Sequence, residues 1–286
     1  MRMVTSQSGA RIFVFESNAD ILEYTDSNKF SSAQRGRSAE ERARFVGRKF
    51  EDWEDVKKGI QTAWEQGMEI LQMSVERLQK ESRPEMKSRK RETKFDDSEG
   101  DEFDFDRYMA GQQPFRSSTR ETHNGPGEIT IITDTTTSAN YEAEDILWRG
   151  AVALALTKLL EEKGYRVELW VINGSFLFDG RPYPVCTACC LKRCSDPLDI
   201  STLVNTVSGW FYRTATFTLL ETIVDKNNER LAWGLGRVYT PIPEDLNMVT
   251  PDLVRIYSSG CYSFSGAIQQ VRGEVERFKT AHNENK

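Results

Sequence analysis

Histidine is scarce in this sequence, and a long apolar run is missing. Only His123 and His282 are present among 286 residues, and both lie in segments whose composition indicates a loose or terminal position. A mechanism built on a histidine base in a rigid pocket is therefore not expected. The longest apolar run, Ala151 to Leu156, is far shorter than the roughly 20 residues that a membrane helix needs. We also find no basic flank with an apolar core after it, so we expect no signal peptide, no membrane span and a cytoplasmic location.

An excess of positive charge is missing as well. The chain has 44 acidic and 38 basic residues, a formal net charge of −6 and a pI near 5.3. A general nucleic-acid binder needs a positive field, so this balance argues weakly against one. The five cysteines, an odd number without an export signal, favour reduced thiols over disulfides. The sequence also has no phosphate loop, nucleophile elbow or kinase signature.

The most informative stretch runs from Glu128 to Gly174, and it predicts a strand, a helix and a second strand. The first strand is a short β-branched run that includes Ile129, Ile131 and Ile132. Acidic residues load the first turn of the helix, and apolar residues then follow on nearly every side, so we expect this helix to be covered broadly. A unit of this length predicts two parallel strands joined by a crossover helix.

Composition divides the chain into four regions. We expect an N-terminal arm over residues 1–40, a helical region over 41–79, a partly disordered charged linker over 80–124 and an α/β domain over 125–281. Within the first region, the short apolar segment from Ile12 to Phe15 is interpreted as an edge strand or an arm. In the helical region the tryptophans are interpreted as packing anchors. In the α/β domain, Val185 to Leu191 is interpreted as a strand antiparallel to the one that begins at Arg166, while Asn173-Gly174 and Asp179-Gly180 are interpreted as turns.

The linker joins two blocks of opposite charge. A basic run between Lys80 and Lys94 precedes an acidic block between Asp96 and Asp106. Such neighbouring blocks are typical of a solvated linker. The alternative is a nucleic-acid arm, although aromatic residues do not interleave with its basic residues; the arm would consist of Lys87, Arg89, Lys90 and Arg91. Four apolar residues within or just after the acidic block are candidates for docking back onto the core: Phe103, Phe105, Tyr108 and Met109.

A first candidate site follows the predicted strand at its carboxyl end. Asp134, Thr136 and Ser138 form a D-x-T-x-S pattern, whose carboxylate and hydroxyl oxygens suit a hard divalent cation such as Mg²⁺. This loop resembles the metal-dependent adhesion site of von Willebrand factor A-like domains, and it lies where open α/β sheets bind ligands. The favoured alternative is structural: the hydroxyls cap the helix and Asp134 ends the strand.

A second candidate site is a cysteine cluster made of Cys186, Cys189, Cys190 and Cys194. Four thiols could hold Zn²⁺ or an iron–sulfur cluster, or act in redox chemistry. The spacing is not that of a standard zinc ribbon, and alternation along a strand would turn Cys186 and Cys190 to one face and Cys189 to the other. Packing of these cysteines in the core is the favoured alternative.

A third candidate is a polar cluster of charged residues within apolar segments, made of Arg149, Asp199, Arg213 and Glu221. An unpaired buried charge is very costly, so such residues are expected to pair. Arg149 with Asp199, or Arg213 with Glu221, would be structural pairs. A functional polar cluster is the alternative.

Several short motifs together resemble a known family. They are Phe45-Val-Gly47, Trp53, Trp64-Glu-Gln-Gly67, Phe105 to Gly111 with Pro114, Arg149-Gly150-Ala151, Gly164-Tyr165 with Val167-Glu168-Leu169, and Pro197-Leu198-Asp199. This order is similar to a family of uncharacterised proteins encoded by bacteriophages and prophages. The resemblance covers roughly residues 40–225 and implies no catalytic residues.

The sequence thus predicts an α/β fold, a von Willebrand factor A-like (Rossmann-like) layered sheet with an N-terminal helical region. We expect a non-enzymatic binding or assembly protein of phage origin, which engages another protein or a second copy of itself, with Mg²⁺ at the D-x-T-x-S loop ahead of Zn²⁺ at the cysteines. The alternatives are a metal-dependent enzyme acting on nucleic acid or phosphate, and a nucleic-acid-associated protein that uses the basic run 80–94.

Overall fold

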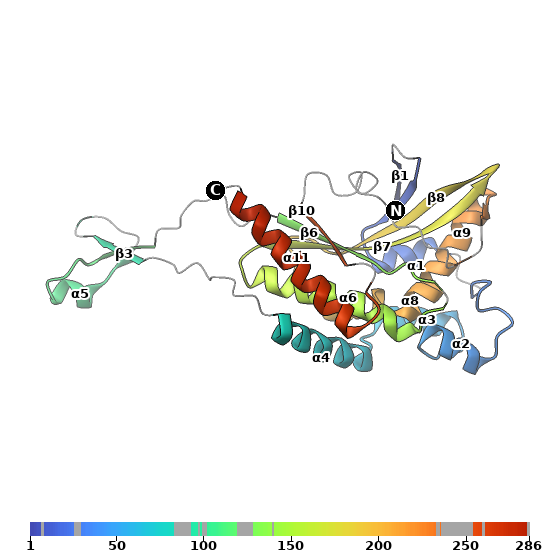
Figure 1. Cartoon of the computed structure of the whole chain (residues 1–286), viewed down its shortest axis with the longest axis horizontal. Helices are drawn as coiled ribbons and strands as arrows, with labels where there is room; N and C mark the ends of the chain where they lie inside the picture. Colours follow the sequence, from blue (N-terminus) through green and yellow to red (C-terminus); the bar gives the residue numbers. More distant parts are fainter. Residues whose placement is uncertain are drawn as a thin grey trace.

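The structure, a computed structural model, describes residues 1–6, 9–25, 30–82, 93–96, 98, 102–118, 128–138, 140–232, 235, 254–258 and 261–284. Its centre is a mixed sheet, with α4, α6 and α11 together on one side of it (Figure 1). The expected α/β class is therefore confirmed. The strands of this sheet are β1 (Arg2–Thr5), β2 (Arg11–Phe15), β6 (Glu128–Asp134), β7 (Arg166–Asp179), β8 (Arg181–Lys192), β9 (Arg230–Leu231) and β10 (Val254–Ser258).

The described helices of the main body begin and end close to sequence signals. They are α1 (Asn18–Tyr24), α2 (Ala39–Val46), α3 (Trp53–Gln61), α4 (Glu65–Ser82), α6 (Ala143–Glu161), α7 (Ile200–Thr206), α8 (Gly209–Phe211), the π-helical turn η1 (Tyr212–Thr216), α9 (Phe217–Asn227) and α11 (Phe264–Glu284). Ser38 and Glu41 form a capping box at α2, and Asp52 caps α3. Trp53 is buried, which confirms its role as a packing anchor.

The strand order is β1-β2-β8-β7-β6-β10, and β9 pairs with β7 away from this path. β6 runs parallel to both of its neighbours, so that Ile131 lies opposite Leu169 on β7 and Ile256 on β10. The parallel pair predicted from Glu128 to Gly174 is confirmed, and β8 is antiparallel to β7 as expected. β6 therefore ends between two parallel strands, whose carboxyl ends lie at the same edge of the sheet.

The N-terminal arm is part of this sheet. β2 pairs in parallel with β8, with Ile12 opposite Cys186, and β1 pairs with β2. The sheet thus extends beyond the α/β domain expected over residues 125–281, and the segment from Ile12 to Phe15 is a strand, one of its two interpretations. Pairing between strands so distant along the chain depends on tertiary packing, which local periodicity does not report.

Helix α6 is covered on all sides. Every residue from Ala151 to Leu156 is at most 1% exposed. One side of α6 packs on β6 and β7 through residues such as Ile131 and Leu169, while α4 and α11 cover the other side with Leu71, Val75 and Val271 among others. Two layers of cover explain why this helix is apolar all round rather than amphipathic.

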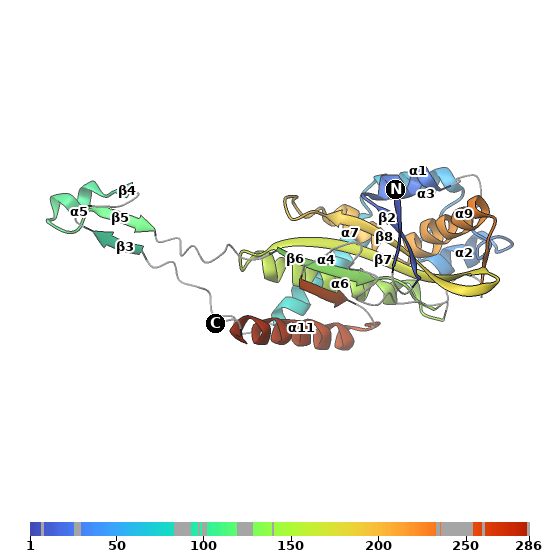
Figure 2. The same cartoon turned by 90° about the horizontal axis from the view of Figure 1, so that it is seen from above.

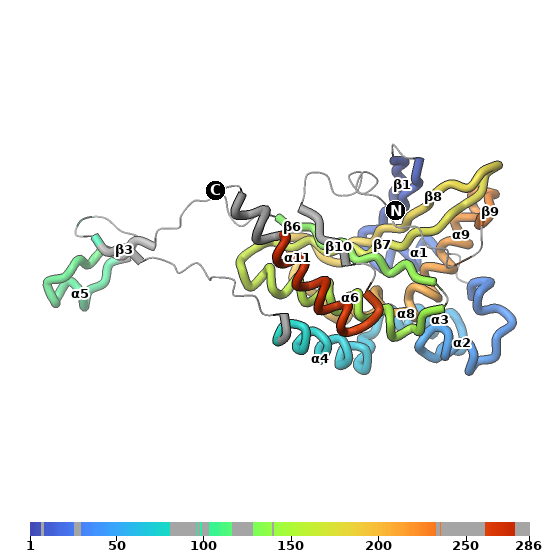
Figure 3. The backbone as a smooth tube through the Cα atoms, viewed as in Figure 1, coloured from blue at the N-terminus to red at the C-terminus, as the bar shows by residue number. Residues whose placement is uncertain are grey.

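Residues of the predicted linker form a small folded unit, which we call the module and define as residues 93–118. It contains β3 (Thr93–Asp96), β4 (Glu102–Phe103), α5 (Phe105–Met109) and β5 (Phe115–Ser118), with β5 between β3 and β4. Figures 1 and 2 show it well away from the main sheet, and the backbone trace in Figure 3 shows the same separation. The charged linker expected over 80–124 therefore contains regular structure within it.

Candidate functional site

The loop after β6, residues 134–141, lies at the carboxyl end of the central parallel strands. The backbone N–H of Thr135 donates to the carbonyl of Ile172 (3.1 Å), and the N–H of Gly174 donates to Oγ1 of Thr136 (2.7 Å). The Thr135 hydroxyl donates to the side-chain oxygen of Asn173. The expected turn at Asn173-Gly174 is thus wrong: both residues lie within β7, and they fasten this loop to the sheet.

Arg149 of α6 binds this loop through its backbone. Its Nη1 atom donates to the carbonyls of Asp134 and Thr136, both at 2.6 Å, and its Nη2 atom donates to the hydroxyl of Tyr262. The side chain is 2% exposed, and its guanidinium lies 4.5 Å from the centre of the Tyr262 ring. Three hydrogen bonds from a buried cation hold the end of β6, the start of the loop and the segment after β10 together.

Arg213 binds the far half of the same loop from η1. Its Nη2 atom donates to the carbonyl of Tyr141 and, at 3.5 Å, to that of Ser138, while Nη1 donates to the carbonyl of Phe45 in α2. The guanidinium also lies 4.6 Å from the centre of the Phe45 ring. Burial lowers the pKa of Arg213 from its ordinary value. Arg213 and Tyr212 both lie in the π-helical turn, and π-helical turns are frequent at functional sites.

Tyr212 and Tyr262 also contact the loop. The hydroxyl of Tyr212 lies 3.4 Å from the carbonyl of Thr137 and donates to it, and burial raises the pKa of this phenol. Tyr141 stacks on Tyr262 with the ring centres 3.8 Å apart and the planes 8° from parallel. We call Arg149, Arg213 and Tyr212 the carbonyl clamp, because each donates to backbone carbonyls of this loop.

The oxygen atoms of the predicted Mg²⁺ site are engaged elsewhere. Oδ1 of Asp134 accepts from the backbone N–H of Thr136 (2.8 Å), and Oγ1 of Thr136 accepts from Gly174. Asp134 and Thr136 are buried, Ser138 is half-buried, and the Arg149 cation bonds the carbonyls of the first two residues. A dication beside a buried guanidinium is electrostatically unfavourable, so this donor set fits Mg²⁺ poorly.

No three His, Cys, Asp or Glu side chains come close enough to hold a metal ion within the part of the chain that the structure describes. The metal prediction at Asp134, Thr136 and Ser138 stays a prediction, which a Mn²⁺ titration of the wild type and of an Asp134→Ala variant would test.

The cysteine cluster is divided between the two faces of β8. Cys186 and Cys190 pack on one face, and Cys189 packs on the other, as strand alternation predicted. Cys194 is half-buried, and its thiol lies 3.7 Å from the carbonyl of Arg166. Burial raises the pKa of the Cys190 thiol to about 12 and that of Cys189 well above its ordinary value. Since the thiolate is the metal ligand, these buried neutral thiols are typical of core residues.

The predicted polar cluster is not assembled in the structure. Asp199 caps α7, where it accepts from Ser201 and Thr202. Glu221 accepts from the N–H of Ser32 (2.7 Å) and pairs with Arg35 at 3.6 Å. The two arginines of that cluster instead share the loop after β6, so the expected Arg149–Asp199 and Arg213–Glu221 pairs are wrong. Backbone carbonyls accept hydrogen bonds from both guanidinium groups, a pairing that the sequence did not suggest.

The candidate nucleic-acid arm, Lys87, Arg89, Lys90 and Arg91, lies outside the described residues. None of the helices in the described part of the chain has both the length and the hydropathy needed to cross a bilayer.

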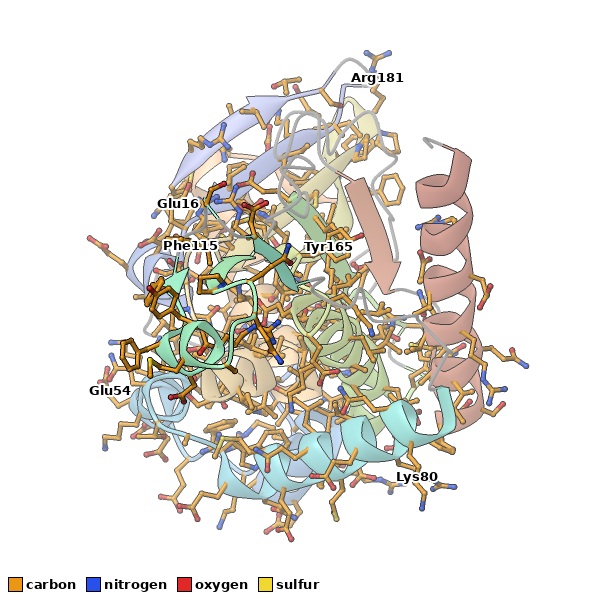
Figure 4. The ribbon with its side chains drawn as sticks, turned by 90° about the vertical axis from the view of Figure 1, so that its left-hand side faces the viewer. Glu16, Glu54, Lys80, Phe115, Tyr165 and Arg181 are labelled. Atoms are coloured by element: carbon orange, nitrogen blue, oxygen red, sulfur yellow. The ribbon has the colours of Figure 1, made fainter. Side chains whose placement is uncertain are left out.

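The module exposes apolar side chains, whereas the loop after β6 has polar groups that are buried. Its exposed residues are Phe103 (50%), Phe105 (63%), Tyr108 (58%) and Met109 (69%). The ring of Phe103 contacts those of Tyr108 (5.5 Å) and Phe115 (5.2 Å), and Phe105 lies 6.5 Å from Tyr108. Phe103, Phe105 and Tyr108 therefore form one cluster of exposed rings, and Met109 follows Tyr108 in α5. We call these four residues the aromatic patch. Figure 4 shows Phe115 and the surrounding rings at the end of the molecule that the module occupies.

A model of one protein family, described as a domain of unknown function (DUF7192), matches residues 8–265. The chain belongs to the DUF7192 family. No curated protein and no solved structure matches it. The matched span contains β2, the module, the carbonyl clamp and β10, while β1 precedes it. The DUF7192 domain of this chain therefore includes the module and β2, both of which the expected boundary at residue 125 had separated from the sheet.

Proposed function

We propose that this DUF7192 protein is a non-enzymatic binding or assembly protein, and that it holds an arginine- or lysine-rich surface of a partner protein with its module. The aromatic patch carries this proposal. Its members are between 50% and 69% exposed, and they lie together on one small unit that stands apart from the main body. A contiguous exposed apolar patch with a polar surround is typical of a protein interaction site.

The charge of the module indicates the chemistry of the partner. Residues 93–118 contain seven acidic residues against three basic ones. Ring faces attract guanidinium and ammonium groups, and nearby carboxylates strengthen that attraction. The chain itself shows this contact, since Arg213 lies over the Phe45 ring. A basic segment would meet the rings of the patch together with the carboxylates of Asp104 and Asp106, at the start of α5.

The carbonyl clamp supports a structural role for the loop after β6. The carbonyls of this loop accept hydrogen bonds from Arg149, Arg213 and Tyr212, so these side-chain donors hold the backbone of the loop in place. The more specific fold assignment, a von Willebrand factor A-like domain, belongs to this proposal and is supported by the position of β6 between two parallel strands. Bacteriophage origin rests on the motif resemblance, which includes Phe105 to Gly111 of the module.

Binding of a labelled nona-arginine peptide to the full chain tests the proposal. We compare the wild type, a Phe105→Ser/Tyr108→Ser double variant and a Met73→Ser control, which changes a 57% exposed apolar residue on α4. We expect the double variant to bind at least ~10-fold more weakly, since each cation–π contact contributes about 0.5–2 kcal/mol, and the control to bind like the wild type. Equal binding by all three proteins, measured by fluorescence anisotropy, would overturn the proposal.

A further inference from the structure

The module is too small to be stable through its own core. It spans residues 93–118, and its strands have four, two and four residues. Units below about 40 residues usually need disulfides, metals or association with another chain. All five cysteines of the chain lie at or beyond residue 186, and within the described residues no His, Cys, Asp or Glu group could hold a metal ion. Association with another chain would supply that stability.

The aromatic patch is exposed in the part of the chain that the structure describes. Phe105 and Met109 are 63% and 69% exposed. Figures 1 and 2 give two perpendicular views in which the module lies clear of the main body. The described main body therefore leaves this patch available to another molecule.

A second copy of the chain carries a segment of opposite charge. Residues 80–94 contain seven basic and three acidic residues, the mirror image of the balance in residues 93–118. Because each copy has both segments, the module of one copy and the basic run of the other can pair twice, which is the arrangement of an isologous two-fold dimer.

We infer that the aromatic patch binds the basic run of a second copy, so that two chains associate reciprocally through residues 80–118. This inference rests on the proposed function, because it names the partner of the same surface. It assigns to Lys87, Arg89, Lys90 and Arg91 a protein ligand in place of nucleic acid. Rings and carboxylates on one surface would hold the guanidinium and ammonium groups of that run.

Mixing two variants, each of which is expected not to dimerise alone, tests the inference in the full-length chain. The first variant is Phe105→Ser/Tyr108→Ser, which lacks the patch and keeps the basic run. The second is Lys87→Glu/Arg89→Glu/Lys90→Glu/Arg91→Glu, which lacks the run and keeps the patch. Sedimentation velocity is measured for each protein alone and for an equimolar mixture, over about two orders of magnitude in concentration. Thermal unfolding of each variant verifies that the main body is folded.

We expect the wild type to form dimers, each variant alone to be monomeric, and the mixture to form a heterodimer. The heterodimer should be ~10-fold or more weaker than the wild-type dimer, since only one of its two contacts can form. Raising the salt to about 1 M should dissociate the wild type, because exposed charges are then screened beyond roughly 3 Å. Met73→Ser should behave like the wild type.

Three results would overturn the inference. A wild type that is monomeric at every concentration would do so, as would a charge-reversed variant that dimerises like the wild type. A wild-type monomer whose basic run instead binds a single-stranded oligonucleotide would assign that run to nucleic acid. In each case the charge-reversed variant still carries the patch, so its binding of nona-arginine separates failure of this inference from failure of the proposed function.

Discussion

The loop after β6 and the module differ in where their contacts lie. In the loop, the carbonyls of Asp134, Thr136 and Tyr141 accept hydrogen bonds from buried guanidiniums of the same chain. In the module, Phe105 and Met109 face solvent. The loop has the sequence pattern of a ligand site and the contacts of a structural element. The module has the composition of a linker and the surface of an interaction site. Satisfied groups stabilise the fold, whereas exposed apolar groups are available to bind.

The largest expected effect on the free energy of unfolding concerns the loop after β6. Arg149→Met removes the donor to two buried carbonyls, and each buried acceptor left without a partner costs about 1–3 kcal/mol. We expect the free energy of unfolding to fall by about 3–5 kcal/mol, as for the loss of one partner in a buried charged contact. Urea denaturation monitored by tryptophan fluorescence measures this.

Arg166→Met is the matched control for that variant. Arg166 pairs with Glu128 at 2.7 Å, and its side chain is 65% exposed. A surface pair of this kind contributes at most about 1 kcal/mol. If Arg149→Met were no more destabilising than this control, the carbonyl clamp would not hold the loop. The contrast between a loop held within the chain and an exposed module would then be contradicted.

A smaller effect is expected where α8 packs against the start of α6. A Cβ atom on Gly209 would lie 2.7 Å from the carbonyl oxygen and 2.8 Å from Cα of Ala143. Backbone cannot move aside as a flexible side chain can, so we expect Gly209→Ala to cost about 1–3 kcal/mol. Since η1 follows α8 directly, the same change should displace Arg213.

Gly273→Ala provides the opposite control on α11, where nothing lies within 4 Å of an added Cβ. Alanine is the better helix former by about 1 kcal/mol, so this variant should be slightly more stable than the wild type. Thermal unfolding of both variants checks the pair. A Gly209→Ala protein as stable as Gly273→Ala would show that the α8–α6 contact is loose.

The smallest effect concerns the buried thiols. Burial raises the pKa of Cys190 to about 12 and that of Cys261 to about 11, from an ordinary value of 9.0. As the pH rises above 9, the unfolded chain loses these protons first. The stability contributed by the neutral thiols is therefore complete below pH 9, and it is lost as the pH rises from 9 towards 12.

Cys190→Ala should make this pH dependence shallower, by up to about 1.4 kcal/mol per pH unit. Urea denaturation between pH 8.5 and about 10.5 measures the slope for wild type and variant. Identical slopes would mean that Cys190 titrates in the folded chain as it does in the unfolded one, contrary to its burial.

The parts of the fold that were predictable are those set by local pattern. The all-round apolar run in α6 indicated a helix covered on every side, and the β-branched run before Asp134 indicated a buried strand. Alternation along β8 correctly separated Cys189 from Cys186 and Cys190. In each case the periodicity of one element determined which residues are buried.

The remaining features depend on tertiary contacts. The apolar surroundings of Arg149 and Arg213 showed that each needs a partner, but backbone carbonyls carry no sequence signal. Asn173-Gly174 has the composition of a turn and lies within β7, because its groups bond the loop after β6. The strands of the module have two to four residues, which is too short for a period to be recognised.

Hydrogen–deuterium exchange of the full-length chain at low and high protein concentration tests the central claim most directly. The account predicts that peptides from residues 102–118 exchange more slowly at high concentration, because a second copy covers the module. Peptides from residues 134–141 should be protected equally at both concentrations, because the carbonyl clamp lies within one chain. Unchanged exchange in the module, or protection of the loop that depends on concentration, would contradict it.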